Sequence, residues 1–116
     1  MKEVTLYHHP RCSKSRATLA LLRSRGIEPE IVDYMKNPPD ANDLARILGM
    51  LEMAPKDLLR KGEPAYLSLG LAGIVDDSGE VIRQMIANPI LIERPIVVVG
   101  NQARIGRPPE KVLEIL

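Results

Sequence analysis

The sequence predicts an α/β fold, a mixed four-stranded sheet flanked by helices, and three observations support this prediction. Short β-branched or apolar runs alternate with helical patterns along the chain. One helical pattern separates the first two strand signals, which is the order of a βαβ unit with parallel strands. The 116 residues suit one domain, and 45% hydrophobic with 27% charged residues is typical of a globular chain.

The N-terminal part contains the predicted βαβ unit. Lys2–Tyr7 is predicted as a strand that ends in the polar turn His8-His9-Pro10-Arg11. A helical pattern follows over Ser13–Arg25, with Gly26 as its C-terminal cap, and Glu30–Tyr34 is the second strand. The apolar face of this helix is predicted to contain Ala17, Leu19, Ala20, Leu21 and Leu22.

The middle of the chain predicts a small helical insertion at about residues 40–70 within a single domain of residues 1–116. Asn37-Pro38-Pro39 breaks the chain, and Asp40 is suited to cap the helix that follows. Pro55 and Pro64 suit the first turns of further short helices. Because the insertion is too short for a core of its own, we expect no second domain.

The last part of the chain is predicted to be β-rich after one more helix, which Asp77 caps and Asn88-Pro89 ends. The segments that follow are the apolar run Pro89–Ile92, the strand Ile96–Val99, the hairpin turn Gly100-Asn101, the edge strand Ala103–Ile105 and a helix opened by Pro108-Pro109. The order β-α-β, insertion, α, β-β, α is the layout of a thioredoxin-like fold.

Composition excludes several classes of function. Sixteen Lys and Arg against fifteen Asp and Glu give a net charge of +1, and the chain has no Trp or Phe, so we expect no nucleic-acid partner. There is no apolar run of the ~18–20 residues that span a bilayer and no signal peptide, so we expect no membrane partner. A single cysteine excludes an internal disulfide framework and favours a reducing, cytoplasmic location.

Cys12 is the candidate nucleophile because it lies where the first strand passes into the first helix. The amides of the first helical turn have no intrahelical acceptors, and the helix dipole adds partial positive charge there. Both effects favour a thiolate, and the same amides can bind an oxyanion. The alternative is a small buried hydrophobic residue. The polar and charged neighbours from His8 to Ala17 argue against it.

Two further residues near Cys12 leave alternatives open. Ser15 stands at the spacing Cys-x-x-Ser, where its hydroxyl can hydrogen-bond the thiolate without closing a disulfide, or it is a solvated serine. His8 either orients the cysteine or an anion, or is a histidine in a surface loop. His8 and His9 with Cys12 are too few ligands for a metal, so we expect no metal site.

The segment Tyr7-His8-His9-Pro10-Arg11-Cys12-Ser13-Lys14-Ser15-Arg16 resembles the signature loop of the glutaredoxin-dependent arsenate reductases. Three other segments resemble the same family, namely Leu58-Leu59-Arg60-Lys61, the run from Asn88 to Val98, and the run from Ala103 to Glu110. The resemblance covers the whole chain in order. This sequence departs from the family at His9, where well-studied members have Asn.

The resemblance implies a role for seven residues. These are Cys12 as the nucleophile, Arg60, Arg94 and Arg107 as ligands of the arsenic oxyanion, His8 and Ser15 as residues that support the thiolate, and Pro95 as a cis-proline beside it. Arginine also suits this role on chemical grounds, because its planar fork recognises tetrahedral oxyanions through paired hydrogen bonds.

The implied reaction is reduction of arsenate to arsenite through a thioarsenate adduct on Cys12. Glutathione would be the co-substrate, glutaredoxin the protein partner, no cofactor would be bound, and the chain is expected to be a monomer. One alternative is a glutathione-dependent thiol-disulfide oxidoreductase without arsenate specificity. Another is an Spx-like regulator that binds RNA polymerase, although such regulators typically have a second cysteine where this chain has Ser15.

Overall fold

In the computed structural model, which describes residues 3–116, the chain divides into two compact units. The first unit joins the N-terminal part up to Asn37 to Arg94–Leu116, and the second unit is Pro38–Glu93. Lys2 of the predicted first strand lies outside the described residues. None of the helices in the described part of the chain is both long enough and apolar enough to cross a membrane.

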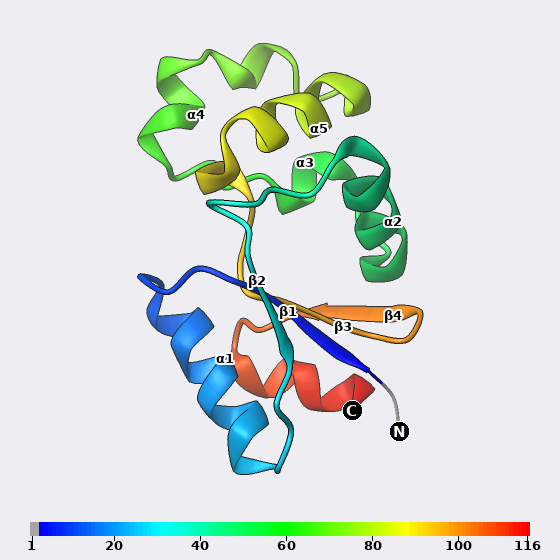
Figure 1. The fold of residues 1–116 in the computed structure, drawn as a ribbon. Helices are drawn as coiled ribbons and strands as arrows, with labels where there is room; N and C mark the ends of the chain where they lie inside the picture. The colour runs from blue at the N-terminus through cyan, green and yellow to red at the C-terminus, as the bar shows by residue number, and fades with distance from the viewer. Residues whose placement is uncertain (1–2) are drawn as a thin grey trace. The chain divides into compact units, whose positions relative to one another are not determined.

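The first unit is built on a mixed four-stranded sheet (Figure 1). Its strands are β1 (Val4–His8), β2 (Glu30–Asp33), β3 (Ile96–Val99) and β4 (Gln102–Ile105). The order across the sheet is β2-β1-β3-β4. β1 is parallel to β2 and antiparallel to β3, and β3 is antiparallel to β4. The predicted parallel βαβ unit, the hairpin and its edge strand are therefore confirmed.

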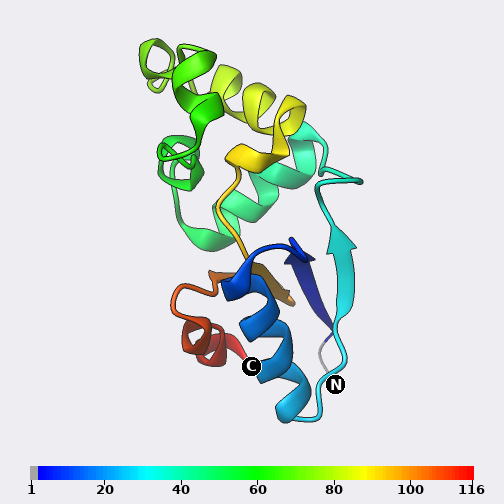
Figure 2. The ribbon, with the colours of Figure 1, turned by 90° about the vertical axis from the view of Figure 1, so that its left-hand side faces the viewer.

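Two helices, α1 (Ser13–Ser24) and the 3₁₀ helix η3 (Pro109–Ile115), pack side by side on one face of this sheet (Figures 1 and 2). The core between the sheet and these two helices is formed by Leu6, Leu22, Val97, Val99, Val112 and Ile115. An ordinary α-helix was expected for the last element. Residues three apart eclipse in a 3₁₀ helix, and this brings Val112 and Ile115 onto the same buried face.

The buried stripe of α1 differs from the predicted one. Ala17 and Ala20 are exposed, whereas Ser15, Thr18 and Leu22 are fully buried. These three residues share one face because they are separated by three and four positions. Small polar side chains therefore occupy the inward face of α1 at the end that carries Cys12, which an apolar pattern cannot reveal.

The second unit consists of short helices. They are α2 (Ala41–Leu51), α3 (Pro55–Leu58), α4 (Pro64–Ser68), η1 (Leu71–Gly73), α5 (Ser78–Ala87) and η2 (Pro89–Leu91). Asp40 and Asp77 accept hydrogen bonds from the backbone N–H groups of Asp43 and Glu80, as expected of N-terminal caps. Pro55 and Pro64 occupy the first turns of α3 and α4, which was also predicted.

The helical segment is longer than the predicted insertion of residues 40–70, because α5 packs against α2 and α3. Its fully buried apolar side chains include Leu44, Ile47, Leu58, Val81, Met85 and Leu91. Pro89–Ile92 is not a strand. Pro89 begins the 3₁₀ helix η2, whose turn is closed by Leu91 N–H donating to Asn88 O at 2.9 Å. The assignment of the whole chain to one domain stays a prediction.

Candidate active site

Cys12 is the N-terminal cap residue of α1, in the loop that follows β1. The loop is held by short hydrogen bonds on both sides of the thiol. Cys12 N–H donates to His9 O at 2.9 Å, and Arg16 N–H donates to Cys12 O at 3.0 Å. The Arg16 guanidinium also donates to Pro10 O at 2.9 Å. Cys12 is partly exposed, so its thiol is fixed in place and still accessible to a reactant.

Opposing effects determine the pKa of the Cys12 thiol. Burial raises this pKa, because the charged form loses hydration. The backbone N–H of Ser15, the Arg94 side chain and the backbone N–H of Lys14 each lower the pKa by stabilising the thiolate. Together these groups outweigh burial, and the pKa lies below its ordinary value of 9.0. The amides of the helix start and the Arg94 side chain therefore lower the pKa of the thiol, the direction that the sequence predicted.

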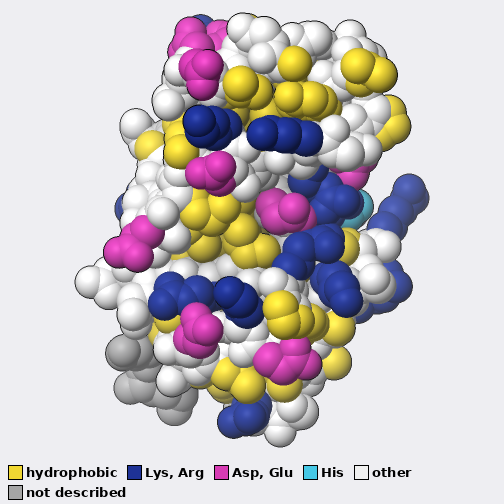
Figure 3. Space-filling model, turned by 180° about the vertical axis from the view of Figure 1, so that it is seen from behind, with side chains coloured by type: hydrophobic (Ala, Val, Ile, Leu, Met, Phe, Trp, Pro, Cys, Tyr) yellow, Lys and Arg dark blue, Asp and Glu magenta, His cyan; other side chains and the backbone are white. Residues whose placement is uncertain are grey.

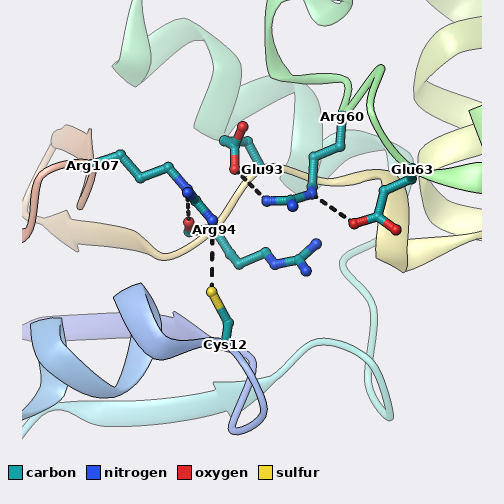
Figure 4. A network of polar contacts seen from close by, with 6 residues as sticks. All are labelled: Cys12, Arg60, Glu63, Glu93, Arg94 and Arg107. Carbon is teal, nitrogen blue, oxygen red and sulfur yellow. Dashed lines mark hydrogen bonds and ion pairs between the residues drawn. The ribbon is translucent and has the colours of Figure 1, made fainter.

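Arg94 and Arg107, both in the first unit, lie beside Cys12. Arg94 is 7% exposed and immediately precedes the cis-proline Pro95 at the start of β3. Arg107 directs Nη2 at the Cys12 Sγ, 3.7 Å away, and donates from Nε to Arg94 O at 2.8 Å (Figure 4). Arg107 also precedes a cis-proline, Pro108. The structure thus brings together the thiol and two of the three predicted arginines, and the cis-proline Pro95 directly follows one of them.

Gly106 and Thr18 support this arrangement, and neither was singled out from the sequence. Gly106 N–H donates to Pro95 O at 2.9 Å. A Cβ on Gly106 would lie 2.4 Å from Thr18 Oγ1 and 2.8 Å from Pro95 Cγ. Only a glycine allows the backbone before Arg107 to approach Pro95 and α1 so closely. The single sequence signal was the position of Gly106 inside a family-like segment.

Ser15 serves the site in a different way from the one considered from the sequence. Its hydroxyl hydrogen-bonds with His8 Nδ1 at 2.5 Å and accepts the His9 N–H at 3.0 Å. The contact of Ser15 with the thiol is made by its backbone N–H. Ser15 is 0% exposed and His8 6% exposed. The alternatives of a solvated serine and a surface-loop histidine are therefore wrong.

The pKa of His8 lies below its ordinary value of 6.5, mainly because the ring is buried. The positive charges of Arg16 and Arg23 and the neighbouring His9 lower this pKa further. Asp33, the register partner of His8 on β2, acts in the opposite direction. Since the neutral form is favoured, His8 contributes a hydrogen bond to Ser15 and not a positive charge beside the thiol.

Arg60, the third predicted arginine, belongs to the second unit and follows α3. Its Nε donates to Glu63 at 3.0 Å and its Nη1 donates to Glu93 at 2.7 Å (Figure 4). The Arg60 N–H donates to Leu91 O at 2.7 Å. Sequence reasoning missed both glutamates, because neither spacing nor composition indicates that they share one partner.

Charged side chains of both signs nearly balance, and the net charge of the chain is only +1. Figure 3 shows one face of the molecule, on which acidic and basic side chains both occur. Within residues 3–116, no group of three or more His, Cys, Asp or Glu side chains is arranged to hold a metal ion.

An accessible thiol of lowered pKa at the start of a helix, on a mixed sheet whose β3 is preceded by a cis-proline, is typical of the class of thioredoxin-like thiol proteins. Comparison with known proteins places the chain within this class. The model of the ArsC family matches residues 7–115, and the chain belongs to that family. The predicted family and fold class are thereby confirmed.

The relatives cover the chain almost completely. Uncharacterized protein YfgD of Escherichia coli (strain K12) is 51% identical over 118 residues, 99% of this chain and 98% of that protein. An arsenate reductase of Neisseria meningitidis serogroup A is 40% identical over 100% of both chains. The solved structure of an arsenate reductase from Vibrio cholerae has a TM-score of 0.95 and 43% identity, and covers 99% of this chain and 98% of that one.

Proposed function

We propose that this protein is an arsenate reductase in which Cys12 is the nucleophile. One observation carries the proposal: a partly exposed thiol whose pKa is lowered lies between two guanidinium groups and the amides of a helix start. This combination suits attack on a bound oxyanion, because the anion and the nucleophile need the same positive surroundings. The names of the Neisseria and Vibrio relatives agree with this reaction.

In the first step the Cys12 thiolate forms a bond from Sγ to As(V), and one arsenate oxygen leaves as water after it is protonated. Arg94 and Arg107 offset the negative charge of the oxyanion during this exchange. The product is a thioarsenate ester on Cys12, and arsenic is still As(V).

The electrons for reduction come from two external thiols, because the chain has a single cysteine. Glutathione displaces a second oxygen as water and forms an As–S bond. A glutaredoxin thiol then attacks the glutathione sulfur. The new disulfide leaves two electrons on arsenic, which becomes As(III). Hydrolysis of the remaining As–S bond releases arsenite and Cys12. The need for reduced glutathione suits a cytoplasmic location.

The other predicted site residues have supporting roles in this proposal. Arg60 binds the oxyanion together with Arg94 and Arg107. His8 and Ser15 hold the loop from which the Ser15 amide reaches the thiolate, and Pro95 forms the wall beside it. No bound cofactor takes part, and the active form is a monomer.

The test is arsenate turnover by the purified protein with glutathione and glutaredoxin, measured with Cys12→Ser as the comparison. We expect turnover by the wild type that depends on both thiol partners and is abolished by the substitution. Turnover that persists in Cys12→Ser, or a wild type without activity, would refute the proposal.

A second variant separates arsenate reduction from general thiol-disulfide exchange. Arg94→Ala is expected to lose arsenate reduction, because the oxyanion loses a ligand and the thiol loses a stabilising charge. The oxidoreductase alternative would be favoured if the wild type does not turn over arsenate and Arg94→Ala has the same disulfide-exchange activity as the wild type.

A further inference from the structure

Arg60, the third arginine of the proposed oxyanion site, is paired with two glutamates. Its guanidinium is enclosed by two carboxylates, with Glu63 bonded to Nε and Glu93 bonded to Nη1. The three side chains are 22%, 19% and 28% exposed, respectively, so water screens them less than it screens a surface ion pair. We call these three residues the Arg60 clamp.

Backbone hydrogen bonds fix the positions of Arg60 and Glu93 relative to each other. Leu59 and Ile92 form an antiparallel bridge. On one side of it Arg60 N–H donates to Leu91 O at 2.7 Å, and on the other Glu93 N–H donates to Leu58 O at 2.9 Å. Arg60 and Glu93 therefore start from backbone positions that are tied together. Glu63 is held less firmly, through a local turn in which its N–H donates to Arg60 O at 3.3 Å.

The formal charge of the clamp opposes the role of its arginine. One guanidinium paired with two carboxylates carries a formal charge of −1. An isolated arginine attracts an oxyanion, whereas an oxyanion that approaches this group meets two negative charges within hydrogen-bond distance of the same guanidinium. The carboxylates also restrict the guanidinium to one orientation, which favours binding. The two effects have opposite signs and are separable by experiment.

We propose that Glu63 and Glu93 are positioning residues that hold Arg60 in place and, through their negative charge, weaken its affinity for a tetrahedral oxyanion. This inference rests on the proposed function, in which Arg60 binds the substrate. Glu93 has the larger effect, because its bond to Arg60 is shorter and its backbone is tied to α3.

The test compares Glu93→Gln with Glu93→Ala in steady-state arsenate reduction. Glutamine keeps a carbonyl oxygen for Arg60 Nη1 and removes the charge. KM for arsenate is expected to fall about fivefold in Glu93→Gln, with kcat within about twofold of the wild type. KM in Glu93→Ala is expected to be severalfold higher than in Glu93→Gln, because alanine also removes the acceptor. A KM in Glu93→Gln equal to or above the wild-type value overturns the proposal.

The matched control is Glu114→Gln. Glu114 pairs with Arg104 at 2.9 Å in the first unit, so this variant makes the same change in net charge at a different arginine. We expect its KM to stay within about twofold of the wild type. A fall in KM equal to that of Glu93→Gln would show that the effect comes from net charge alone, and it would refute the proposed role of Glu93.

A second measurement does not depend on turnover. Arsenate and sulfate are titrated calorimetrically into Cys12→Ser, with and without Glu93→Gln. Tighter binding of both anions by the double variant is expected. If the double variant binds the anions more tightly but the wild type does not reduce arsenate, the proposed function is refuted and the clamp remains supported. Equal affinity in the two variants, or no binding to either, would overturn the clamp.

Discussion

At the scale of single residues, the Cys12 thiol shows how a lone cysteine is activated without a neighbouring base. Two backbone amides and the Arg94 side chain stabilise the thiolate, and they act against the cost of burial. His8 takes part only through Ser15, because burial favours its neutral form. The positive charge at the thiol therefore comes from groups that remain charged at any physiological pH.

Replacing Arg94 with glutamine should raise the pKa of Cys12, because a charged donor is lost and burial remains. Alkylation of the thiol at neutral pH should become slower, since only the thiolate reacts. Arsenate kcat/KM should fall by about 10²-fold, as when one donor to a developing oxyanion is removed. Absorbance of the thiolate against pH measures the first effect. Arg104→Gln is the control, and a pKa that shifts equally in both variants would contradict the assignment.

The lowered pKa of His8 predicts how stability depends on pH. The unfolded histidine takes up a proton near its ordinary pKa of 6.5, whereas the folded one does so at lower pH. The contribution of neutral His8 is therefore complete above pH 6.5 and is lost as the pH falls through the folded pKa. The free energy of unfolding should fall less steeply in His8→Gln than in the wild type between about pH 7 and about pH 5. Identical slopes in urea titrations would contradict this.

The sequence identified the side chains at the thiol better than their contacts. Cys12, Arg94 and Arg107 could be named from a helix start and a family-like pattern, and they lie together. The direction of the Ser15 hydroxyl could not be predicted, since it depends on His8 reaching back from the end of β1. Glu93 was beyond prediction for the same reason, because its partner is 33 positions away in sequence.

At the scale of elements, the site depends on how closely the segment before Arg107 approaches α1 and Pro95. Gly106 should not tolerate a methyl group, since its Cβ would lie 2.4 Å from the buried Thr18 Oγ1. We expect Gly106→Ala to destabilise the protein by about 1–3 kcal/mol and to lower arsenate activity further through the displaced Arg107.

The control for this prediction is Gly49→Ala. Gly49 lies within α2, and a Cβ added there would meet nothing within 4 Å beyond its own helix, so alanine should stabilise the helix by about 0.5–1 kcal/mol. Urea denaturation measures both variants. A Gly106→Ala protein as stable as Gly49→Ala would show that the close approach does not constrain this position.

Local chemistry predicted the elements well wherever one residue decides the outcome. Asp40 and Asp77 cap their helices, Pro55 and Pro64 begin theirs, and Gly100 adopts a positive φ of 62° in the hairpin turn. Prediction failed where packing decides. An apolar run cannot distinguish a strand from the 3₁₀ helix η2, and helical spacing cannot show that Ser15 and Thr18 face inward.

At the scale of the whole molecule, the groups that set the Cys12 pKa all lie in the first unit, whereas Met85 is fully buried in the second. Met85→Ala should lower the free energy of unfolding by about 2–5 kcal/mol, because truncation of this buried side chain of α5 leaves a cavity in the packing. The Cys12 pKa of the folded variant should equal that of the wild type. Urea denaturation and thiolate absorbance measure the two quantities.

Leu67→Ala is the control for this prediction, because Leu67 is 84% exposed on α4 and its truncation should change stability by less than about 0.5 kcal/mol. A shift of the Cys12 pKa in Met85→Ala would show that thiol activation depends on the second unit. No pattern in the chain indicated two units, since the helix after Asp77 was expected to lie beyond the insertion.

Because Cys12 is accessible, titration of its thiol gives the concentration of intact active sites directly. Each molecule has one thiol, partly exposed at the start of α1, and no tryptophan to absorb strongly in the near ultraviolet. One equivalent of a thiol reagent therefore reports the number of intact sites, without correction for structural cysteines. Specific activities of different preparations and variants can be normalised to that titre, so a damaged sample is distinguishable from a slow enzyme.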